Sequence, residues 1–300
     1  MRQLLPLAST VVAVALLVAC SPEPADPPAT GQTSRAVPEP AGTLQTFDLD
    51  DAGTPRRYDV YVPPGPDQGE PRPAVVVLPG TNVSLDLMQD LTGLDALADA
   101  EGFLVVYVGA GPDGFDSKLC CGGTDHDVQV VEQVLAEVEV TWPLDRARLY
   151  ATGFSAGGAM AYKLAVRAPD VFAAVAPVSG GFYPDPRAPH PEDVVPTSAP
   201  SVISFAGGAD PDYDDFLGGL DRWRAGADCA EPVAEDVEGA DGVQHSSAAC
   251  AGDSTVEVYT VADMGHAWPG GSGDAAFGYD AAGISATDLI WAFFATRSRP

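Results

Sequence analysis

Short apolar runs of strand length alternate with segments of helical periodicity along most of this chain, and this alternation limits the possible folds most strongly. Several runs are continuous in apolar residues, as in PAVVVL (73–78) and FLVVYV (103–108). Such runs are typical of parallel strands that are covered on both faces. We expect strands at 56–62, 73–78, 103–108, 147–152, 172–178, 201–206 and 255–261, and helices at 85–101, 127–141, 156–168, 213–225 and 285–297. The sequence therefore predicts an α/β fold over residues 44–300, with a mostly parallel central sheet flanked by helices in a single catalytic domain.

The first forty residues have a different composition. One arginine is followed by an apolar stretch from Leu4 to Ala19 and by Cys20, which is the pattern of an export signal over residues 1–19. A buried N-terminal helix is the alternative, but the polar segment that follows offers it nothing to pack against. The letters LVAC at the end of the stretch resemble a bacterial lipobox, in which Cys20 becomes the lipid-modified first residue; ordinary secretion is the other interpretation. Residues 20–43 are proline-rich and predict a flexible tether.

The charge of the chain excludes two classes of partner. The formal net charge is −28, and only two lysines occur, Lys118 and Lys163. Nucleic acids and anionic lipid surfaces would repel such a molecule. No internal stretch is apolar and long enough to span a bilayer. Contact with a membrane is therefore expected only through a lipid anchor on Cys20.

The segment GFSAG (153–157) matches the pattern G-x-S-x-G. The match alone is weak evidence in a chain with 32 glycines. Its context is stronger, because the strand expected at 147–152 leads into it and the helix expected at 156–168 leads out of it. A strand–turn–helix of this kind is the setting of a nucleophile elbow. We predict that Ser155 is a catalytic nucleophile; the alternative is a tight turn with a spectator serine.

A serine hydroxyl needs a base, and the base needs an acid that orients it. In α/β proteins with such an elbow the acid and then the histidine follow the serine in the chain. Only His245 and His266 come after a strand that could supply the acid. His245 lies in a polar stretch typical of a solvated surface, whereas His266 lies on a Gly/Pro-rich loop just beyond strand 255–261. The base is therefore predicted to be His266 rather than His126, His190 or His245.

The predicted acid is Asp210. Strand 201–206 runs into AGGADP (206–211), which places Asp210 just past the carboxyl end of the strand, at the sheet edge that also carries Ser155. Asp212, Asp214 and Asp215 are competitors, and an exposed acidic run is the alternative interpretation of that cluster.

A tetrahedral oxyanion needs backbone donors. One is expected from the N–H of Ala156, and the other from Thr81 in the loop PGTN (79–82) after strand 73–78, although this second position could slip by one residue. Asn82 and Trp268 are expected to line the substrate pocket.

Four cysteines remain after Cys20. An even number in an exported chain indicates disulfides, and Cys120, Cys121, Cys229 and Cys250 allow three pairings. Zinc is the competing interpretation, but no second cysteine or histidine cluster stands at ligand spacing. No metal ion or organic cofactor is expected.

Four stretches resemble a known family of secreted α/β-hydrolases, the polyhydroxybutyrate depolymerase/feruloyl esterase family (carbohydrate esterase family 1 and its relatives). They are TGLDALADAEGFLVVY (92–107), LYATGFSAGGAMAY (149–162), GHAWPGG (265–271) and ATDLIWAFF (286–294). Together with the strand order, the resemblance covers nearly all of residues 44–300 and implies the α/β-hydrolase fold. It places Ser155, Asp210 and His266 at the triad positions. It also implies a disulfide between Cys229 and Cys250, which leaves Cys120 and Cys121 bridged to each other or reduced.

This sequence departs from the family at two positions. Members usually have His-Gly in the oxyanion loop, where this chain has Pro79-Gly80, and often a histidine where it has Ala206. Backbone donors survive such changes, so the departures put in doubt only the transfer of substrate preference.

The resemblance implies an exported serine carboxylic ester hydrolase that acts through an acyl-enzyme. The substrate classes are feruloyl or acetyl esters of polysaccharide, which we favour, short polyhydroxyalkanoate esters and small soluble esters. An envelope acyltransferase with the same triad is an alternative. A non-catalytic binding lipoprotein with the same fold is another, and the intact triad argues against it.

Overall fold

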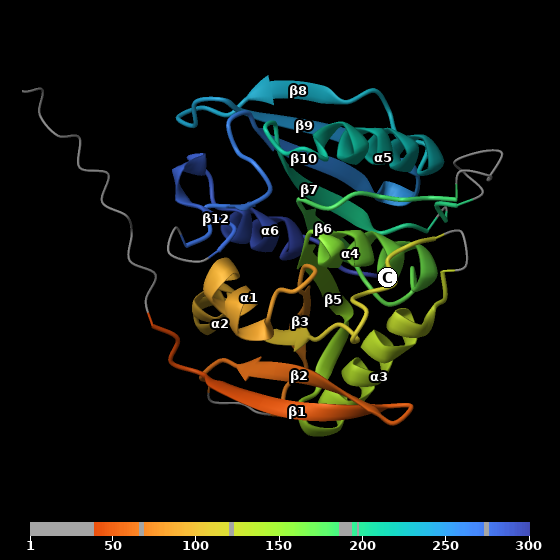
Figure 1. Ribbon diagram of the computed structural model, residues 1–300, viewed down its shortest axis with the longest axis vertical. Coiled ribbons are helices and arrows are strands. Elements are labelled where there is room, and N and C mark those ends of the chain that lie inside the picture. The colour runs from red at the N-terminus through yellow and green to blue at the C-terminus, as the bar shows by residue number, and fades with distance from the viewer. Residues whose placement is uncertain (1–38, 66–68, 120–122, 186–193, 197, 273–275) are drawn as a thin grey trace, which may run out of the picture. The chain divides into compact units, whose positions relative to one another are not determined.

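Within the described residues, ten strands form one sheet (Figure 1). The computed structural model describes residues 39–65, 69–119, 123–185, 194–196, 198–272 and 276–300. Residues 37–300 form one compact unit. The predicted export signal, Cys20 and the tether as far as residue 38 lie outside the described residues, as do Cys120, Cys121 and His190. In the described part of the chain, no helix has the length and apolar character needed to cross a membrane.

The sheet has the strand order β1-β2-β4-β3-β5-β6-β7-β10-β9-β8. Its six middle strands, from β4 to β10 in this order, are parallel. On both sides the outer strands are antiparallel. The strands are β1 (Thr43–Asp51), β2 (Thr54–Val62), β3 (Arg72–Leu78), β4 (Leu104–Val108), β5 (Leu144–Phe154), β6 (Ala174–Val178), β7 (Ser201–Gly207), β8 (Val233–Asp236), β9 (Val243–Ala249) and β10 (Thr255–Val261). The predicted mostly parallel sheet is confirmed.

Three outer strands, the two edge strands β1 and β8 and the strand β9 next to β8, have no counterpart among the predicted strands. β8 is exposed along its whole length, and β1 and β9 have few buried positions. A strand that is not covered on both faces lacks the continuous apolar run that marks a central strand. A further pair, β11 (Trp268–Pro269) and β12 (Gly278–Tyr279), forms a separate two-stranded sheet.

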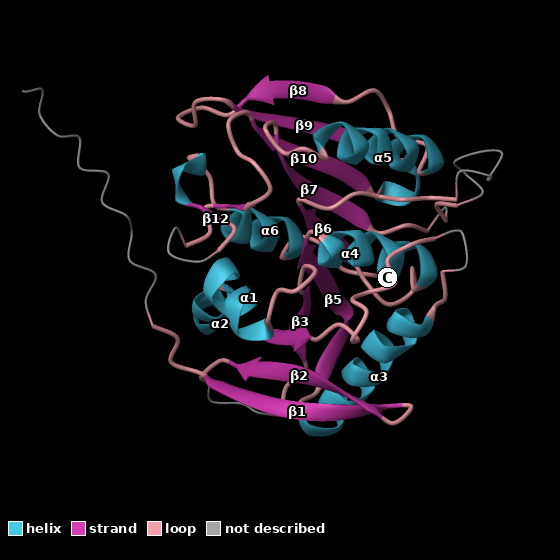
Figure 2. Cartoon of the chain, viewed as in Figure 1, coloured by secondary structure: helices cyan, strands magenta, loops and turns pink. Residues whose placement is uncertain are grey.

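Helices cover both faces of the sheet. Figure 2 shows α1, α2 and α6 on one side and α3, α4 and α5 on the other. The two apolar clusters agree with this arrangement, since one contains residues of α1, α2 and α6 and the other residues of α3, α4 and α5. The helices are α1 (Leu85–Thr92), α2 (Leu94–Glu101), α3 (His126–Thr141), α4 (Ala156–Arg167), α5 (Tyr213–Gly226) and α6 (Ala286–Phe294).

The central strands supply both clusters by simple alternation. In β3, Val76 belongs to one cluster, whereas Val75 and Val77 belong to the other. All three side chains are fully buried, and each such burial contributes about 1.5–3 kcal/mol relative to exposure. Covered on both faces, the sheet forms a rigid base for the loops at its carboxyl edge.

The helix predicted at 85–101 is two helices. Gly93 separates α1 from α2 with φ 60°, and its N–H caps α1 on the carbonyl oxygen of Gln89. A left-handed φ suits glycine at a helix C-terminus, which explains the break. At the other end of the chain, Ser285 caps α6, because its hydroxyl accepts the N–H of Asp288.

A disulfide joins Cys229 to Cys250 and closes a loop with a sequence separation of 21. This confirms the pairing that the family resemblance implied. In the chain-entropy description, a crosslink over such a loop contributes about 3 kcal/mol by restricting the unfolded chain.

Asp95 is a buried carboxylate between α2 and the sheet, and it should make the stability of the fold depend on pH. This carboxylate lies in the first turn of α2, is buried, and accepts a hydrogen bond from the Tyr107 hydroxyl at 2.7 Å. Burial raises its pKa from 3.8 to about 6. Because the folded-state pKa lies above the unfolded one, the group favours folding most below pH 3.8, and this contribution is lost as the pH rises through about 6.

Asp95→Asn cannot ionise and still offers an acceptor to Tyr107. We expect the variant to be more stable than the wild type at pH 8, by up to about 3 kcal/mol, and to show little gain at pH 4. Urea unfolding at both pH values measures the difference. An equal change in stability at the two pH values would contradict this account of Asp95.

Candidate active site

Ser155 stands at a sharp turn between β5 and α4. Its backbone has φ 55° and ψ −117°, a conformation rare for a residue with a side chain. The flanking glycines make the turn possible, because a Cβ at Gly153 would lie 2.4 Å from Gly157 and a Cβ at Gly157 would lie 2.0 Å from the carbonyl oxygen of Leu78. The turn leaves Ser155 half-buried at the N-terminus of α4. This is the predicted strand–turn–helix.

His266 and Asp210 form a hydrogen-bonded pair. Nδ1 of His266 lies 2.7 Å from Oδ2 of Asp210. The Asp210 side chain has no exposed surface, whereas 29% of the His266 side chain is exposed. The other oxygen of Asp210 accepts the N–H of Asp212 at 3.0 Å. The carboxylate is thus held from two sides, and Nε2 is the nitrogen of His266 that is left for other partners.

The loops that carry this pair touch each other after two neighbouring parallel strands, β7 and β10. A Cβ at Gly207 would lie 2.2 Å from the carbonyl oxygen of Met264, and one at Gly208 would lie 2.6 Å from that of Ala262. The N–H of Ala209 donates to the carbonyl oxygen of Met264 at 2.9 Å. Only glycines permit this approach, which brings Asp210 within reach of the histidine loop.

Two residues that the sequence analysis does not identify connect His266 to the nucleophile turn. The ring of Phe154, next to Ser155, lies 5.1 Å from the imidazole of His266 between centroids. The buried Ser179 hydroxyl donates to the carbonyl oxygen of Ala267 at 2.8 Å. Ser179 lies just after β6 and has φ 46°. In the sequence, the Ser-Gly pair at the end of a predicted strand is the feature that could have identified it. Ser155 and the acid–histidine pair thus lie at the same edge of the sheet, with the Phe154 ring packed on His266.

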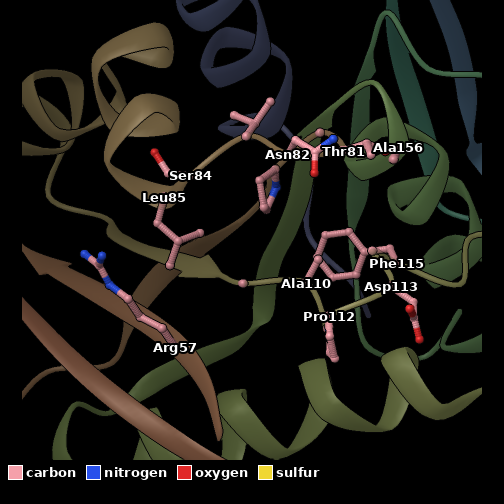
Figure 3. Close-up of a pocket in the computed structure, with 16 residues that line it drawn as sticks. Arg57, Thr81, Asn82, Ser84, Leu85, Ala110, Pro112, Asp113, Phe115 and Ala156 are labelled. Carbon is pink, nitrogen blue, oxygen red and sulfur yellow. The ribbon is translucent and has the colours of Figure 1, made fainter. Parts of the chain in front are cut away.

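A cavity of about 440 Å³ adjoins the nucleophile turn (Figure 3). Ala156, Thr81 and Asn82 line it and lie together at one end in Figure 3. The loop carrying Thr81 is tight, since the N–H of Val83 donates to the carbonyl oxygen of Gly80 at 3.1 Å and Asn82 has φ 60°. The rest of the lining comes from other residues of the same loop, from Arg57 of β2, from the start of α1 and from residues 109–115 after β4.

Gly80 explains why this loop reaches the serine. A Cβ at Gly80 would lie 3.2 Å from Cβ of Ser155 and 3.1 Å from the Phe154 ring. The predicted oxyanion residues therefore lie beside the nucleophile turn and line the cavity. The N–H of Ala156 stands at the start of α4, where backbone donors have no acceptor within the helix.

Trp268 lies elsewhere than predicted. Its side chain is fully buried, and its indole N–H donates to the Thr287 hydroxyl at 3.1 Å, which in turn donates to the carbonyl oxygen of Thr92. It does not line the cavity, so it acts as a core residue that attaches the histidine loop to α6. Asn82, the other expected pocket residue, does line the cavity.

The competing histidines and acids have other partners. His245 is stacked on Tyr259 and bonded to Glu257 at 3.2 Å, and His126 pairs with Asp51. Asp212 lies close enough to Asp210 and His266 for the three to bind a cation, but Asp212 is exposed, and the other two are already bonded to each other. Asp214 and Asp215 are exposed in the first turn of α5.

The comparisons with known proteins agree with this geometry. The family model described as Esterase PHB depolymerase matches residues 56–190. "Putative esterase NocK" from Nocardia uniformis subsp. tsuyamanensis is 35% identical over 274 residues, which cover 79% of this chain and 76% of that protein. "Feruloyl esterase C" from Emericella nidulans is 32% identical over 133 residues, covering 42% of this chain and 47% of that protein.

Among solved structures, the acetyl xylan esterase from Aspergillus awamori matches with a TM-score of 0.62 at 17% identity, over 85% of this chain and 99% of that one. The feruloyl esterase module from Clostridium thermocellum matches with a TM-score of 0.54 at 15% identity, over 75% of this chain and 82% of that one. Likeness at this identity establishes the fold, and the longer alignment with NocK establishes the family. The chain thus has the α/β-hydrolase fold, belongs to the esterase PHB depolymerase family and is a carboxylic ester hydrolase.

Proposed function

We propose that this esterase works through an acyl-enzyme on Ser155, with His266 as the general base and Asp210 as the group that orients it. The observation that carries the proposal is the 2.7 Å hydrogen bond between His266 and the buried Asp210, placed beside the nucleophile turn. Oγ of Ser155 attacks the ester carbonyl carbon while Nε2 of His266 takes its proton. His266 then gives that proton to the alcohol oxygen as the C–O bond breaks.

Water completes the cycle. It attacks the acyl-enzyme with His266 again as base, and the proton returns to Ser155 as the acid leaves. Asp210 keeps Nδ1 protonated and stabilises the imidazolium that forms in both halves. The N–H groups of Ala156 and Thr81 would bind the oxyanion, each worth about 3 kcal/mol in such a site.

The cavity supports an acyl group larger than acetate. Its volume of about 440 Å³ lies in the range of pockets that hold drug-sized ligands, about 300–1,000 Å³. We favour hydroxycinnamoyl esters of polysaccharide, in line with the name of the relative from Emericella nidulans. Short polyhydroxyalkanoate esters are the second candidate, since "Poly(3-hydroxyalkanoate) depolymerase C" from Paucimonas lemoignei is also a relative, although the chain covers 28% of it.

We also propose that the enzyme is exported and anchored by lipid on Cys20. The support is the sequence pattern of residues 1–19 followed by LVAC and the proline-rich segment. The tether would let a soluble domain reach polymeric substrates near the envelope.

Ser155→Ala tests the mechanism. Removing the nucleophile should lower kcat on methyl ferulate by at least about a thousandfold while leaving the thermal unfolding curve in place. His266→Ala should lose nearly as much, and the double variant little more than either, because the two residues act as a unit. Release of ferulate by the purified variants is the measurement. Wild-type turnover by Ser155→Ala in a contaminant-free preparation would refute the mechanism.

His245→Ala is the matched control, because His245 lies on β9 and is bonded to Glu257 rather than to the acid–histidine pair. It should keep the wild-type kcat.

The wild type should also hydrolyse methyl ferulate with a higher kcat/KM than methyl acetate, because only the larger acyl group fills the cavity.

Cys20→Ser tests the anchor. A lipoprotein carries at least two acyl chains, which together give stable membrane binding, so the native enzyme should sediment with membranes. The variant should be released or remain an unprocessed precursor, with the catalytic constants of its domain unchanged. Intact-mass measurement is the direct readout. A mature N-terminus other than Cys20, or Cys20 without added lipid mass, would leave a plain secreted esterase.

A further inference from the structure

The two halves of the ester must lie on opposite sides of Ser155. The cavity is lined by Arg57 of β2, by the loops that follow β3 and β4, and by the first residues of α1 and α4, with no residue from β7 or β10. His266 follows β10, and in the sheet β5 separates β3 from β6, β7 and β10. Since Nδ1 of His266 is bonded to Asp210, the leaving oxygen must approach Nε2. The alcohol half therefore lies beside His266, away from the cavity.

Two phenylalanines pack on His266, and a third packs on one of these two and offers surface to a ligand. The rings of Phe154 and Phe216 have centroids 5.1 Å and 6.3 Å from His266, but both side chains are buried. Phe277 packs on Phe154 at 5.2 Å and is 43% exposed. The exposed apolar surface nearest the histidine in this aromatic stack is thus the ring of Phe277.

The backbone of Phe277 adopts an unfavourable conformation. Its φ is 70°, a conformation that side chains other than glycine rarely adopt. Its carbonyl oxygen accepts the N–H of Trp268 at 2.7 Å, and Gly278 pairs with Trp268 in the small sheet. These contacts attach Phe277 to the loop that carries His266. The unfavourable φ opposes folding, and residues held in such conformations cluster at ligand-binding sites.

We propose that Phe277 selects the alcohol half of the ester by stacking on a flat, ring-shaped alcohol such as the C–H face of a sugar. This inference rests on the proposed acyl-enzyme mechanism, because that mechanism places the alcohol at Nε2 of His266. It deepens the proposal by assigning the acyl half to the cavity and the alcohol half to Phe277.

Two ferulate esters test the assignment, methyl ferulate and ferulate esterified to the primary hydroxyl of arabinose. Both give the same feruloyl-enzyme, so any difference between them arises before the alcohol leaves. In Phe277→Ala the ratio of kcat/KM for the sugar ester to that for the methyl ester should fall at least tenfold. The deacylation rate constant from pre-steady-state bursts should match the wild type with either ester. Phe277→Tyr should restore most of the ratio.

Matched variants keep the test decisive. Phe277→Gly removes the ring and suits φ 70°, so it should show the same loss of ratio in a protein at least as stable as the wild type. Ala110→Phe narrows the cavity and should lower kcat/KM for both ferulate esters by the same factor, with a smaller effect on methyl acetate. An equal fall for both esters in Phe277→Ala and Phe277→Gly, or a fall confined to deacylation, would overturn the role of Phe277. Activity in Ser155→Ala would instead overturn the mechanism on which it rests.

Discussion

The hydrogen bond between Asp210 and His266 is the interaction on which the site depends. Its two residues are 56 positions apart, and they meet because β7 and β10 are parallel neighbours that end at the same sheet edge. Gly207 at the end of β7 and Gly208 after it let the aspartate loop lie directly against the backbone of the histidine loop. A buried carboxylate with an imidazole partner avoids the large cost of an unpaired buried charge. The same bond leaves Nε2 of His266 as the nitrogen that can exchange a proton with substrate.

A second buried network holds the wall of the cavity. Lys163 of α4 is almost fully buried and donates to the carbonyl oxygens of Asp116 and Thr124. Arg56 pairs with Asp127 at 2.6 Å, and Asp127 accepts the N–H of Asp116 at 2.6 Å. Residues 109–115, which line the cavity, directly precede Asp116, which these hydrogen bonds hold in place. Lys163 belongs to α4, the helix that starts at the nucleophile turn. The same helix therefore holds both Ser155 and the segment that forms the cavity wall. Breaking such a buried pair typically costs about 3–5 kcal/mol, so the acyl side of the site is expected to be rigid.

The sequence predicts those parts of the molecule whose physics is local. The central strands are found because each is a continuous apolar run covered on both faces, and the turn at Ser155 because its crowding demands Gly153 and Gly157. β1, β8 and β9 are missed because they lie outside the parallel centre of the sheet and have few or no buried positions. The break at Gly93 is a single φ within one helical pattern. Trp268, Phe277 and Ser179 act through contacts with residues distant in sequence, and periodicity carries no information on such contacts. Position after β7 and the family resemblance favour Asp210 over its acidic neighbours in the sequence, and the hydrogen bond to His266 adds a physical basis.

Labelling with a fluorophosphonate tests the central claim most directly, because the reagent phosphonylates only a serine whose hydroxyl is activated by a base. The wild-type protein should take up one label, and peptide mapping should place it on Ser155. The His266→Ala variant should label far more slowly. A folded wild-type protein that takes up no label, or a label on another residue, would contradict the account of Ser155 as the nucleophile activated by His266.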